Sequence, residues 1–139
     1  IRKVFTDDDW NNEEICQSLM RPTFIYSHLI LSILSPSIHA MAHITGGGFF
    51  ENIPRSLPKG ASAKIDLSAL RILPIFDYLA KTGNIPERDM FNTYNMGVGM
   101  SVVVAKEDVD RALSILKANG EDAYLLGEII ASDEKVTIC

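Results

Sequence analysis

The chain has 139 residues, of which 47% are hydrophobic and 22% charged, a composition that suits one domain with one core. Its formal net charge of −5, with 13 Lys and Arg residues, argues against the large cationic surface that duplex nucleic acid requires. Cys16 and Cys139 are too few for a disulfide framework and lack the spacing of metal ligands. The longest apolar run, residues 24–34, is about half the ~20 residues of a membrane span. We therefore expect a soluble, cytoplasmic protein that binds no nucleic acid.

The amino-terminal part predicts a loop followed by two helices. The acidic run 7–9 has no spaced ligand partners, so it indicates a solvated turn rather than a metal site. Residues 13–20 place apolar side chains on one helical face, and Asn11 with Glu14 has the spacing of a capping box. A second amphipathic helix is expected over residues 26–34, ended by Ser35-Pro36.

The rest of the chain mixes strands and helices without a regular βαβ repeat. A strand over residues 38–44 runs into three glycines and a short helix. A second strand has Ala63, Ile65 and Leu67 inward, alternating with polar Ser62. Helices are expected over residues 75–80, 87–94 and 107–118, and Asn119-Gly120 ends the last of them. A further strand is expected over residues 99–105. Strands 124–130 and 135–138 are expected to form a carboxy-terminal hairpin that turns at Ser132-Asp133. We predict an α+β fold in which helices cover a mixed sheet.

The three glycines make the most informative stretch. Gly46, Gly47 and Gly48 let the backbone come close to a ligand because no Cβ intervenes. Free amides and a helix dipole at that point suit a phosphate, although the Lys-Ser/Thr pair of a P-loop is missing. On spacing alone the turn either binds phosphate or only packs two elements together. His43, just before it, is either a hydrogen-bonded core histidine or an acid/base group.

Residues 38–55 closely resemble the signature of the aminoimidazole ribonucleotide synthetases, or phosphoribosylformylglycinamidine cyclo-ligases, in which His-x-Thr-Gly-Gly-Gly is followed by Glu-Asn-x-Pro-Arg. Residues 74–100 and 113–127 agree with later blocks of that family in order and spacing. The resemblance covers nearly the whole chain. It implies that residues 1–139 are the carboxy-terminal, substrate-binding domain, an expectation that suits a chain opening at Ile1 rather than at Met.

This resemblance implies an ATP-dependent ligase of purine biosynthesis. Such enzymes phosphorylate the formamide oxygen of formylglycinamidine ribonucleotide, and the amidine nitrogen then closes the imidazole ring to give aminoimidazole ribonucleotide. Fixing the reacting atoms supplies much of the rate. ATP and magnesium are expected to bind mainly to a separate amino-terminal domain, which also forms the homodimer, so the fragment alone is expected to be inactive.

The resemblance also implies roles for individual residues. His43 becomes the catalytic candidate, and Asn52 either joins the substrate phosphate site or only organises the turn. Arg55 pairs with Glu51 or with the substrate phosphate. Asn95 and Gly97 line the cleft between this domain and the amino-terminal domain, or Gly97 and Gly99 mark a bulge or strand entry. The expected phosphate-binding residues are Thr45, Gly46, Gly47, Gly48 and Asn52, and no metal ligand is expected.

One segment departs from the family pattern. The Pro-Thr-Arg-Ile-Tyr motif and its following Lys are here Pro-Thr-Phe-Ile-Tyr, residues 22–26, and His28. Phe24 and a mostly neutral His do not replace a bidentate guanidinium. Two alternatives therefore stay open, a divergent paralogue of the same ATP-dependent superfamily with another substrate, and a non-catalytic binding or dimerisation module.

Overall fold

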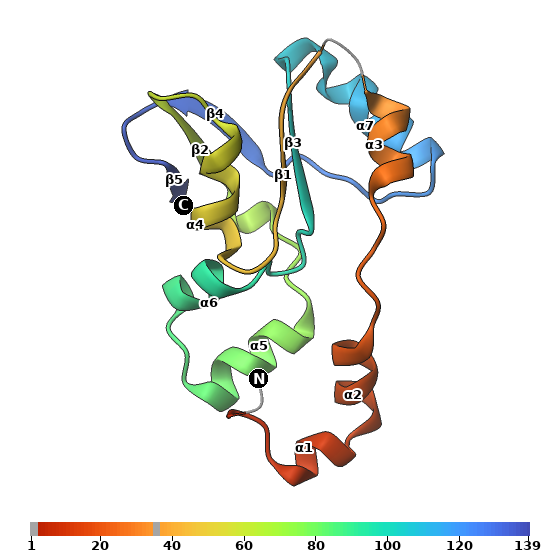
Figure 1. The fold of residues 1–139 in the computed structure, drawn as a ribbon, viewed down its shortest axis with the longest axis vertical. Coiled ribbons are helices and arrows are strands. Elements are labelled where there is room, and N and C mark those ends of the chain that lie inside the picture. Colours follow the sequence, from red (N-terminus) through yellow and green to blue (C-terminus); the bar gives the residue numbers. More distant parts are fainter. Residues whose placement is uncertain (1–2, 35–36) are drawn as a thin grey trace.

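A computed structural model describes residues 3–34 and 37–139. The molecule is elongated, with the helices of residues 7–20 and 74–83 at one end and, at the other, the helices of residues 27–33 and 109–118 beside a two-stranded ribbon of residues 38–43 and 100–104 (Figure 1). The helices are α1 (Asp7–Asn11), α2 (Glu13–Met20), α3 (Ser27–Ile33), α4 (Gly48–Asn52), α5 (Pro74–Gly83), α6 (Glu87–Thr93) and α7 (Val109–Ala118), with short 3₁₀ turns η1 (Ile53–Ser56), η2 (Leu67–Ala69) and η3 (Lys106–Asp108). The strands are β1 (Ile38–His43), β2 (Ala61–Ile65), β3 (Met100–Val104), β4 (Gly127–Ala131) and β5 (Val136–Ile138).

The acidic run forms helix α1, so the predicted solvated loop is wrong. Thr6 is the N-cap, and its backbone N–H donates to the Asp9 carboxylate at 2.7 Å while its side chain accepts from the Asp9 amide. The Tyr78 hydroxyl donates to the same carboxylate. These hydrogen bonds, the one from Tyr78 first, hold the pKa of Asp9 below its ordinary value. One of the three carboxylates is thus a capping group rather than a solvated charge.

Helices α2 and α3 form where their apolar periodicity predicts them. The N-cap of α2 is Asn12 rather than Asn11, because the Asn12 side chain accepts from the amides of Glu14 and Ile15 at 3.0 and 3.2 Å. In α3, Leu29 and Ile33 are buried. The predicted end of this helix at Ser35-Pro36 lies outside the described residues.

The strands form two sheets. β1 pairs antiparallel with β3, and β2 is the middle strand of a sheet ordered β4-β2-β5. β4 is antiparallel to β2 and β5 is parallel to it. The predicted hairpin is therefore wrong, because β2 lies between its two strands. The connection wraps around the start of β2, where Ser132 N donates to Gly60 O and Ala63 N donates to Lys135 O.

Strand β2 also departs from simple alternation. Ala63 and Ile65 are buried as predicted, but Ser62 is fully buried too, and its hydroxyl has no hydrogen-bond partner within the described residues. Lys64, the next polar position of the pattern, is exposed, so the burial on this face is confined to Ser62. The strand ends at Ile65, and Leu67 lies in η2.

One hydrophobic core joins the end of β1, α4, α5, α6 and β2. Phe49 and Ile44 are fully buried at its centre, and the Phe49 ring meets the Phe91 ring edge-on at 5.4 Å. The buried members are Phe5, Ile44, Phe49, Ile53, Ala63, Ile65, Leu79, Met90, Phe91, Met96, Val98 and Val136. This core confirms the α+β fold. Over the two described ranges, no helix is long and apolar enough to cross a bilayer.

Candidate functional site

The glycine turn connects β1 to α4 at the edge of the core. Ile44 N donates to Gly99 O at 2.8 Å, which fixes the end of the β1–β3 ribbon, and the chain then turns through residues 45–47 into α4. Gly47 and Gly48 have φ values of 93° and 54°, a region in which glycine is strongly preferred. The sequence TGGG therefore supplies the conformation that an abrupt strand-to-helix turn needs.

The three glycines differ in what surrounds them. Gly48 is buried, and a Cβ there would overlap the Phe91 carbonyl oxygen and lie 2.9 Å from the Tyr94 carbonyl oxygen. It is required for packing on α6. At Gly46 no atom lies within 4 Å of the position that a Cβ would take. That part of the turn opens outward, so a ligand can approach its backbone.

Asn52 organises the turn from inside. Its side-chain amide donates to the carbonyl oxygens of Gly48 at 2.8 Å, Gly46 at 3.2 Å and Thr45 at 3.4 Å, and the residue is buried. The turn carbonyls are thereby held inward. Gly48 N donates to Thr45 O, whereas the amides of residues 45–47 have no acceptor in the described part of the chain. The structure thus gives Asn52 the organising role and leaves three amides free.

Glu51 and Arg55 border the same turn. The Glu51 carboxylate oxygen lies 2.6 Å from the place where a Gly47 Cβ would be, and Arg55 pairs with that oxygen at 3.0 Å. Arg55 also donates to the Asn52 side-chain oxygen at 3.5 Å. Both charged side chains are more than half exposed. Of the two partners that the sequence left open for Arg55, the structure shows Glu51.

His43 ends β1 with its side chain exposed, opposite Met100 of β3. Its ring meets the Tyr26 ring edge-on, with centroids 5.7 Å apart. Because His43 is exposed, the alternative of a hydrogen-bonded core histidine is wrong. An exposed imidazole two residues from the glycine turn is open to a ligand bound there.

Asn95 and Gly97 form the turn that enters β3. The Asn95 side chain accepts from Gly97 N at 3.1 Å, Val98 N donates to Asn95 O at 2.8 Å, and Gly97 has a φ of 98°. This arrangement places Gly97 at the entry to β3, and the cleft role of Asn95 and Gly97 stays a prediction. Because the Tyr94 carbonyl lies against Gly48, the turn is also brought next to the glycines.

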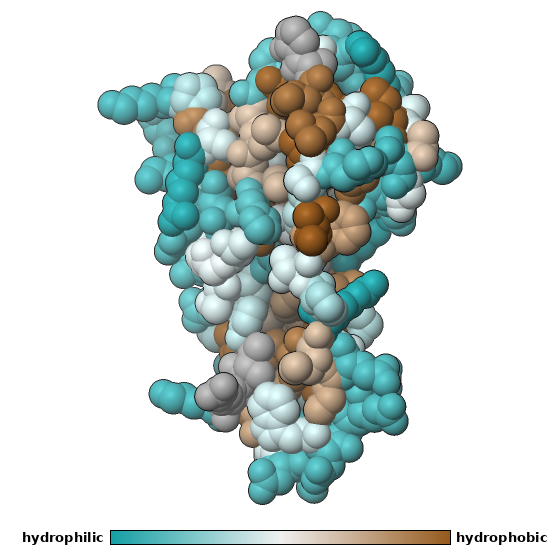
Figure 2. Space-filling model, turned by 45° about the vertical axis from the view of Figure 1, so that its right-hand side comes forward, coloured by the Kyte–Doolittle hydropathy of each residue, from teal (hydrophilic) through white to brown (hydrophobic). Residues whose placement is uncertain are grey.

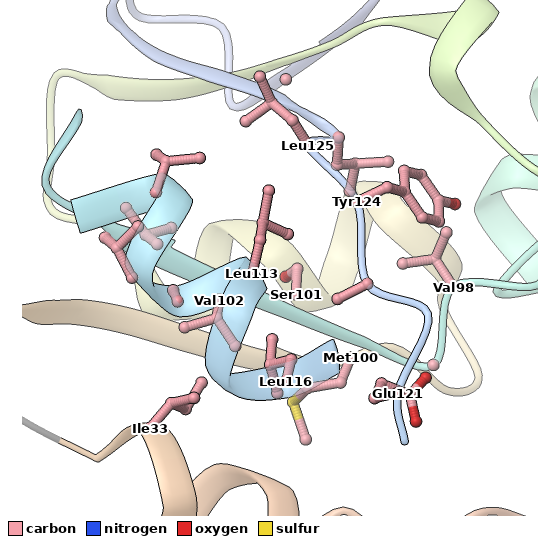
Figure 3. Close-up of a pocket in the computed structure, with 18 of the residues that line it drawn as sticks. Ile33, Val98, Met100, Ser101, Val102, Leu113, Leu116, Glu121, Tyr124 and Leu125 are labelled. Atoms are coloured by element: carbon pink, nitrogen blue, oxygen red, sulfur yellow. The ribbon is translucent and has the colours of Figure 1, made fainter. Parts of the chain in front are cut away.

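A hollow of about 670 Å³ lies between α7, β3 and residues 121–129, and Tyr26 and Gly99 are among the residues that line it. Figure 3 shows Leu113 and Leu116 of α7 and Val102 of β3 directed into it, with the Glu121 carboxylate at one end. Gly97 lines the hollow, whereas His43 and residues 45–48 do not. Its apolar walls suit a hydrocarbon surface better than a phosphorylated sugar. We therefore place the candidate site at the glycine turn.

Apolar side chains also reach the surface near α3. Figure 2 shows a hydrophobic area over the upper half of the molecule, and Ile25, Leu31 and Leu34 are each more than half exposed. Phe24, where the family motif has Arg, is 53% exposed and packs its ring on Tyr26 at 5.2 Å. The missing guanidinium is thus replaced by an aromatic contact.

Sequence reasoning missed Tyr26 as a residue of the site. It packs against His43, and burial, followed by the negative charge of Glu121, raises its pKa. Its place in the Pro-Thr-Phe-Ile-Tyr motif was the available signal. In the described ranges, no three His, Cys, Asp or Glu side chains converge as metal ligands would.

Comparison with known proteins identifies the family. The family described as "AIR synthase related protein, C-terminal domain" matches residues 1–139. The chain belongs to this family. The phosphoribosylformylglycinamidine cyclo-ligase of Alkaliphilus oremlandii is 46% identical over 123 residues, covering 88% of this chain and 36% of the relative. That of Staphylococcus epidermidis is 45% identical over 128 residues, covering 91% and 37%.

A third relative extends the match to the whole chain. The phosphoribosylformylglycinamidine cyclo-ligase of Alkaliphilus metalliredigens is 38% identical over 149 residues, covering 100% of this chain and 43% of the relative. Among solved structures, the crystal structure of E. coli HypE is similar with a TM-score of 0.62 and 19% identity, covering 90% of this chain and 40% of that one. The predicted family and α+β fold are thus confirmed. The chain spans about two fifths of the length of these relatives.

Proposed function

We propose that this chain is the substrate-side domain of a phosphoribosylformylglycinamidine cyclo-ligase. The full enzyme would use ATP to close the imidazole ring of formylglycinamidine ribonucleotide in purine biosynthesis. The main support is the glycine turn, where the amides of residues 45–47 have no acceptor in the described part of the chain and Thr45 and Gly46 are exposed, as is the neighbouring His43. The names of relatives 38–46% identical over most of the chain support the same reaction.

In this proposal the turn binds the substrate phosphate. The backbone amides of Thr45, Gly46 and Gly47 donate to its oxygens, and Gly48 and Asn52 hold the turn in shape from inside. Gly46 is the point of closest approach, because nothing occupies the space beside its Cα. Asn95 and Gly97 support the turn from the neighbouring loop.

His43 is proposed as the acid/base group. Imidazole exchanges protons near neutral pH, so His43 can accept a proton from the amidine nitrogen as that nitrogen attacks the activated carbon. ATP and magnesium would be held mainly by an amino-terminal domain that completes the cleft. That domain would also form the homodimer, and the enzyme would work in the cytoplasm.

A second candidate is a related ATP-dependent enzyme with another substrate. The observation that favours it is Phe24, whose ring packs on Tyr26 where the family motif carries a guanidinium. A substrate with one less anionic group would suit this change, because Phe offers no charge-assisted hydrogen bond. A non-catalytic module has less support, since it gives no reason for an exposed His43 beside three free amides.

The test is ring closure by the full two-domain protein with ATP, magnesium and formylglycinamidine ribonucleotide. We expect His43→Ala to lower kcat by about 100-fold or more. The matched control is His39→Ala, an exposed histidine on the same strand, which should stay within about twofold. Failure of the unsubstituted protein to form aminoimidazole ribonucleotide would sink the proposal, and full activity of His43→Ala would remove its catalytic residue.

The phosphate contact is tested separately with Gly46→Ala. The added methyl meets no protein atom, so folding should be unchanged, but it enters the space assigned to phosphate. We expect KM for the substrate to rise about tenfold at nearly constant kcat. An unchanged KM would show that the phosphate does not lie at this turn.

A further inference from the structure

Tyr26 differs from the residues around it. Residues 20–25 are all exposed, whereas the Tyr26 side chain is half-buried against the β1–β3 ribbon. It immediately precedes α3 as a backbone N-cap, and its carbonyl oxygen accepts from Ile30 N at 2.9 Å. The segment between α2 and α3 is thus attached to the ribbon through one aromatic ring.

The ring of Tyr26 contacts two other rings. The Phe24 ring meets it with centroids 5.2 Å apart and planes at 61°. The His43 imidazole contacts it with centroids 5.7 Å apart and planes at 66°. Edge-to-face contacts of this kind have a preferred geometry, so they restrict how the imidazole rotates.

The hydroxyl end of Tyr26 occupies the space that a side chain on Gly99 would take. A Cβ on Gly99 would overlap the Tyr26 oxygen and lie 2.8 Å from Cζ, so only glycine leaves room for the ring. Gly99 is also the residue whose carbonyl oxygen accepts from Ile44 N, next to His43. The tyrosine therefore spans from the candidate catalytic residue to the backbone of the opposite strand.

We propose that Tyr26 is a positioning residue, which holds the His43 imidazole in the orientation that ring closure needs. Because Gly99 has no side chain, it leaves the space that the hydroxyl end of Tyr26 occupies. This inference rests on the proposed role of His43. It assigns Gly99 a reason that differs from a bulge, namely space for the tyrosine. It also predicts that the ring, rather than the hydroxyl, carries most of the effect on His43.

The experiment compares Tyr26→Leu, Tyr26→Phe and Gly99→Ala in the full two-domain protein. Tyr26→Leu removes the ring, and Gly99→Ala pushes the ring out of the space beside residue 99. Both should lower kcat by about 10- to 100-fold with KM within about twofold, because the reacting groups are misaligned while binding is kept. Tyr26→Phe keeps the ring contact, so its kcat should stay within about threefold.

A spectroscopic readout separates positioning from folding. In the 139-residue chain, the imidazole proton resonances of His43 should move in Tyr26→Leu and Gly99→Ala, since the ring current of Tyr26 is lost or displaced, and stay near their original place in Tyr26→Phe. Phe24→Leu, which removes the other ring that contacts Tyr26, is the matched control and should leave the His43 resonances near their original place.

Two results would overturn the inference while His43→Ala still abolishes activity. One is a Tyr26→Leu enzyme with unchanged kcat. The other is a loss of kcat in Tyr26→Leu that follows a loss of folded protein, with the His43 resonances of the remaining folded fraction unmoved. Full activity of His43→Ala is a different outcome, because it overturns the proposed function itself.

Discussion

The glycine-turn region and the α7 region are built in opposite ways. In the glycine-turn region, made of β1, residues 45–47, α4 and α6, the five-residue helix α4 buries Gly48, Phe49 and Asn52. Helix α7 is twice as long and clearly amphipathic, yet none of its residues is buried. Its apolar face borders the hollow of about 670 Å³ instead of a filled core. The short helix after the glycine turn is thus packed more tightly than the longer amphipathic helix α7.

The difference teaches that an apolar stripe predicts which face of a helix turns inward. It does not predict how closely other side chains pack against that face. Fit depends on space, and at the glycine turn the space is set by missing side chains. The candidate site lies at the tightly packed glycine turn rather than at the hollow beside α7. Free amides need a rigid backbone behind them, and the core around Phe49 provides it.

Replacing Gly48 with Ala should give the largest loss of stability. The new Cβ would overlap the Phe91 carbonyl oxygen, and the left-handed backbone disfavours Ala. We expect a loss of about 4 kcal/mol in the free energy of unfolding of the 139-residue chain, measured by urea denaturation. Gly46→Ala, two residues away in open space, should cost less than about 1 kcal/mol. Equal losses would mean that the turn is not packed as the structure shows.

Leu79→Ala and Leu113→Ala test the contrast between the packed core and the hollow beside α7. Leu79 of α5 is 1% exposed within the core, whereas Leu113 of α7 is half-buried at the hollow. The same change in side chain should cost about 3 kcal/mol at Leu79 and about 1 kcal/mol at Leu113 in urea denaturation. A loss at Leu113 as large as that at Leu79 would show that the hollow is closed in solution and would break the comparison.

Two asparagines give the smallest expected difference. Asn52 is buried and donates to three turn carbonyls, while Asn119 is exposed and donates to the Ile115 carbonyl at the end of α7. We expect Asn52→Ala to cost about 2 kcal/mol, because it removes three hydrogen bonds that hold the turn, one of them buried, and Asn119→Ala less than about 0.5 kcal/mol. Thermal unfolding of the two variants beside the original chain measures both. Comparable losses would contradict the organising role of Asn52.

Local patterns predicted much of the fold and part of the candidate site. Helices α2, α3, α5, α6 and α7 lie where apolar spacing places them, and the strand, glycine turn and helix around His43 follow the predicted order. The capping box of Thr6 and Asp9 was a local signal too, but it was hidden in a run of like charges. Tyr26 was not found as a neighbour of His43, because residues 17 positions apart are joined only when α3 folds onto the ribbon.

By itself the sequence determined the periodic elements, the position of a glycine turn before a helix, and membership of the family, since each of these is encoded in neighbouring residues or in a continuous motif. The tertiary structure alone decided that β2 separates β4 from β5, that Ser62 is buried, and that Gly99 gives room to Tyr26. The physical reason is that pairing, burial and close approach join segments far apart in the chain. Each depends on which partner fills the same space, and that is settled only when the whole core is assembled.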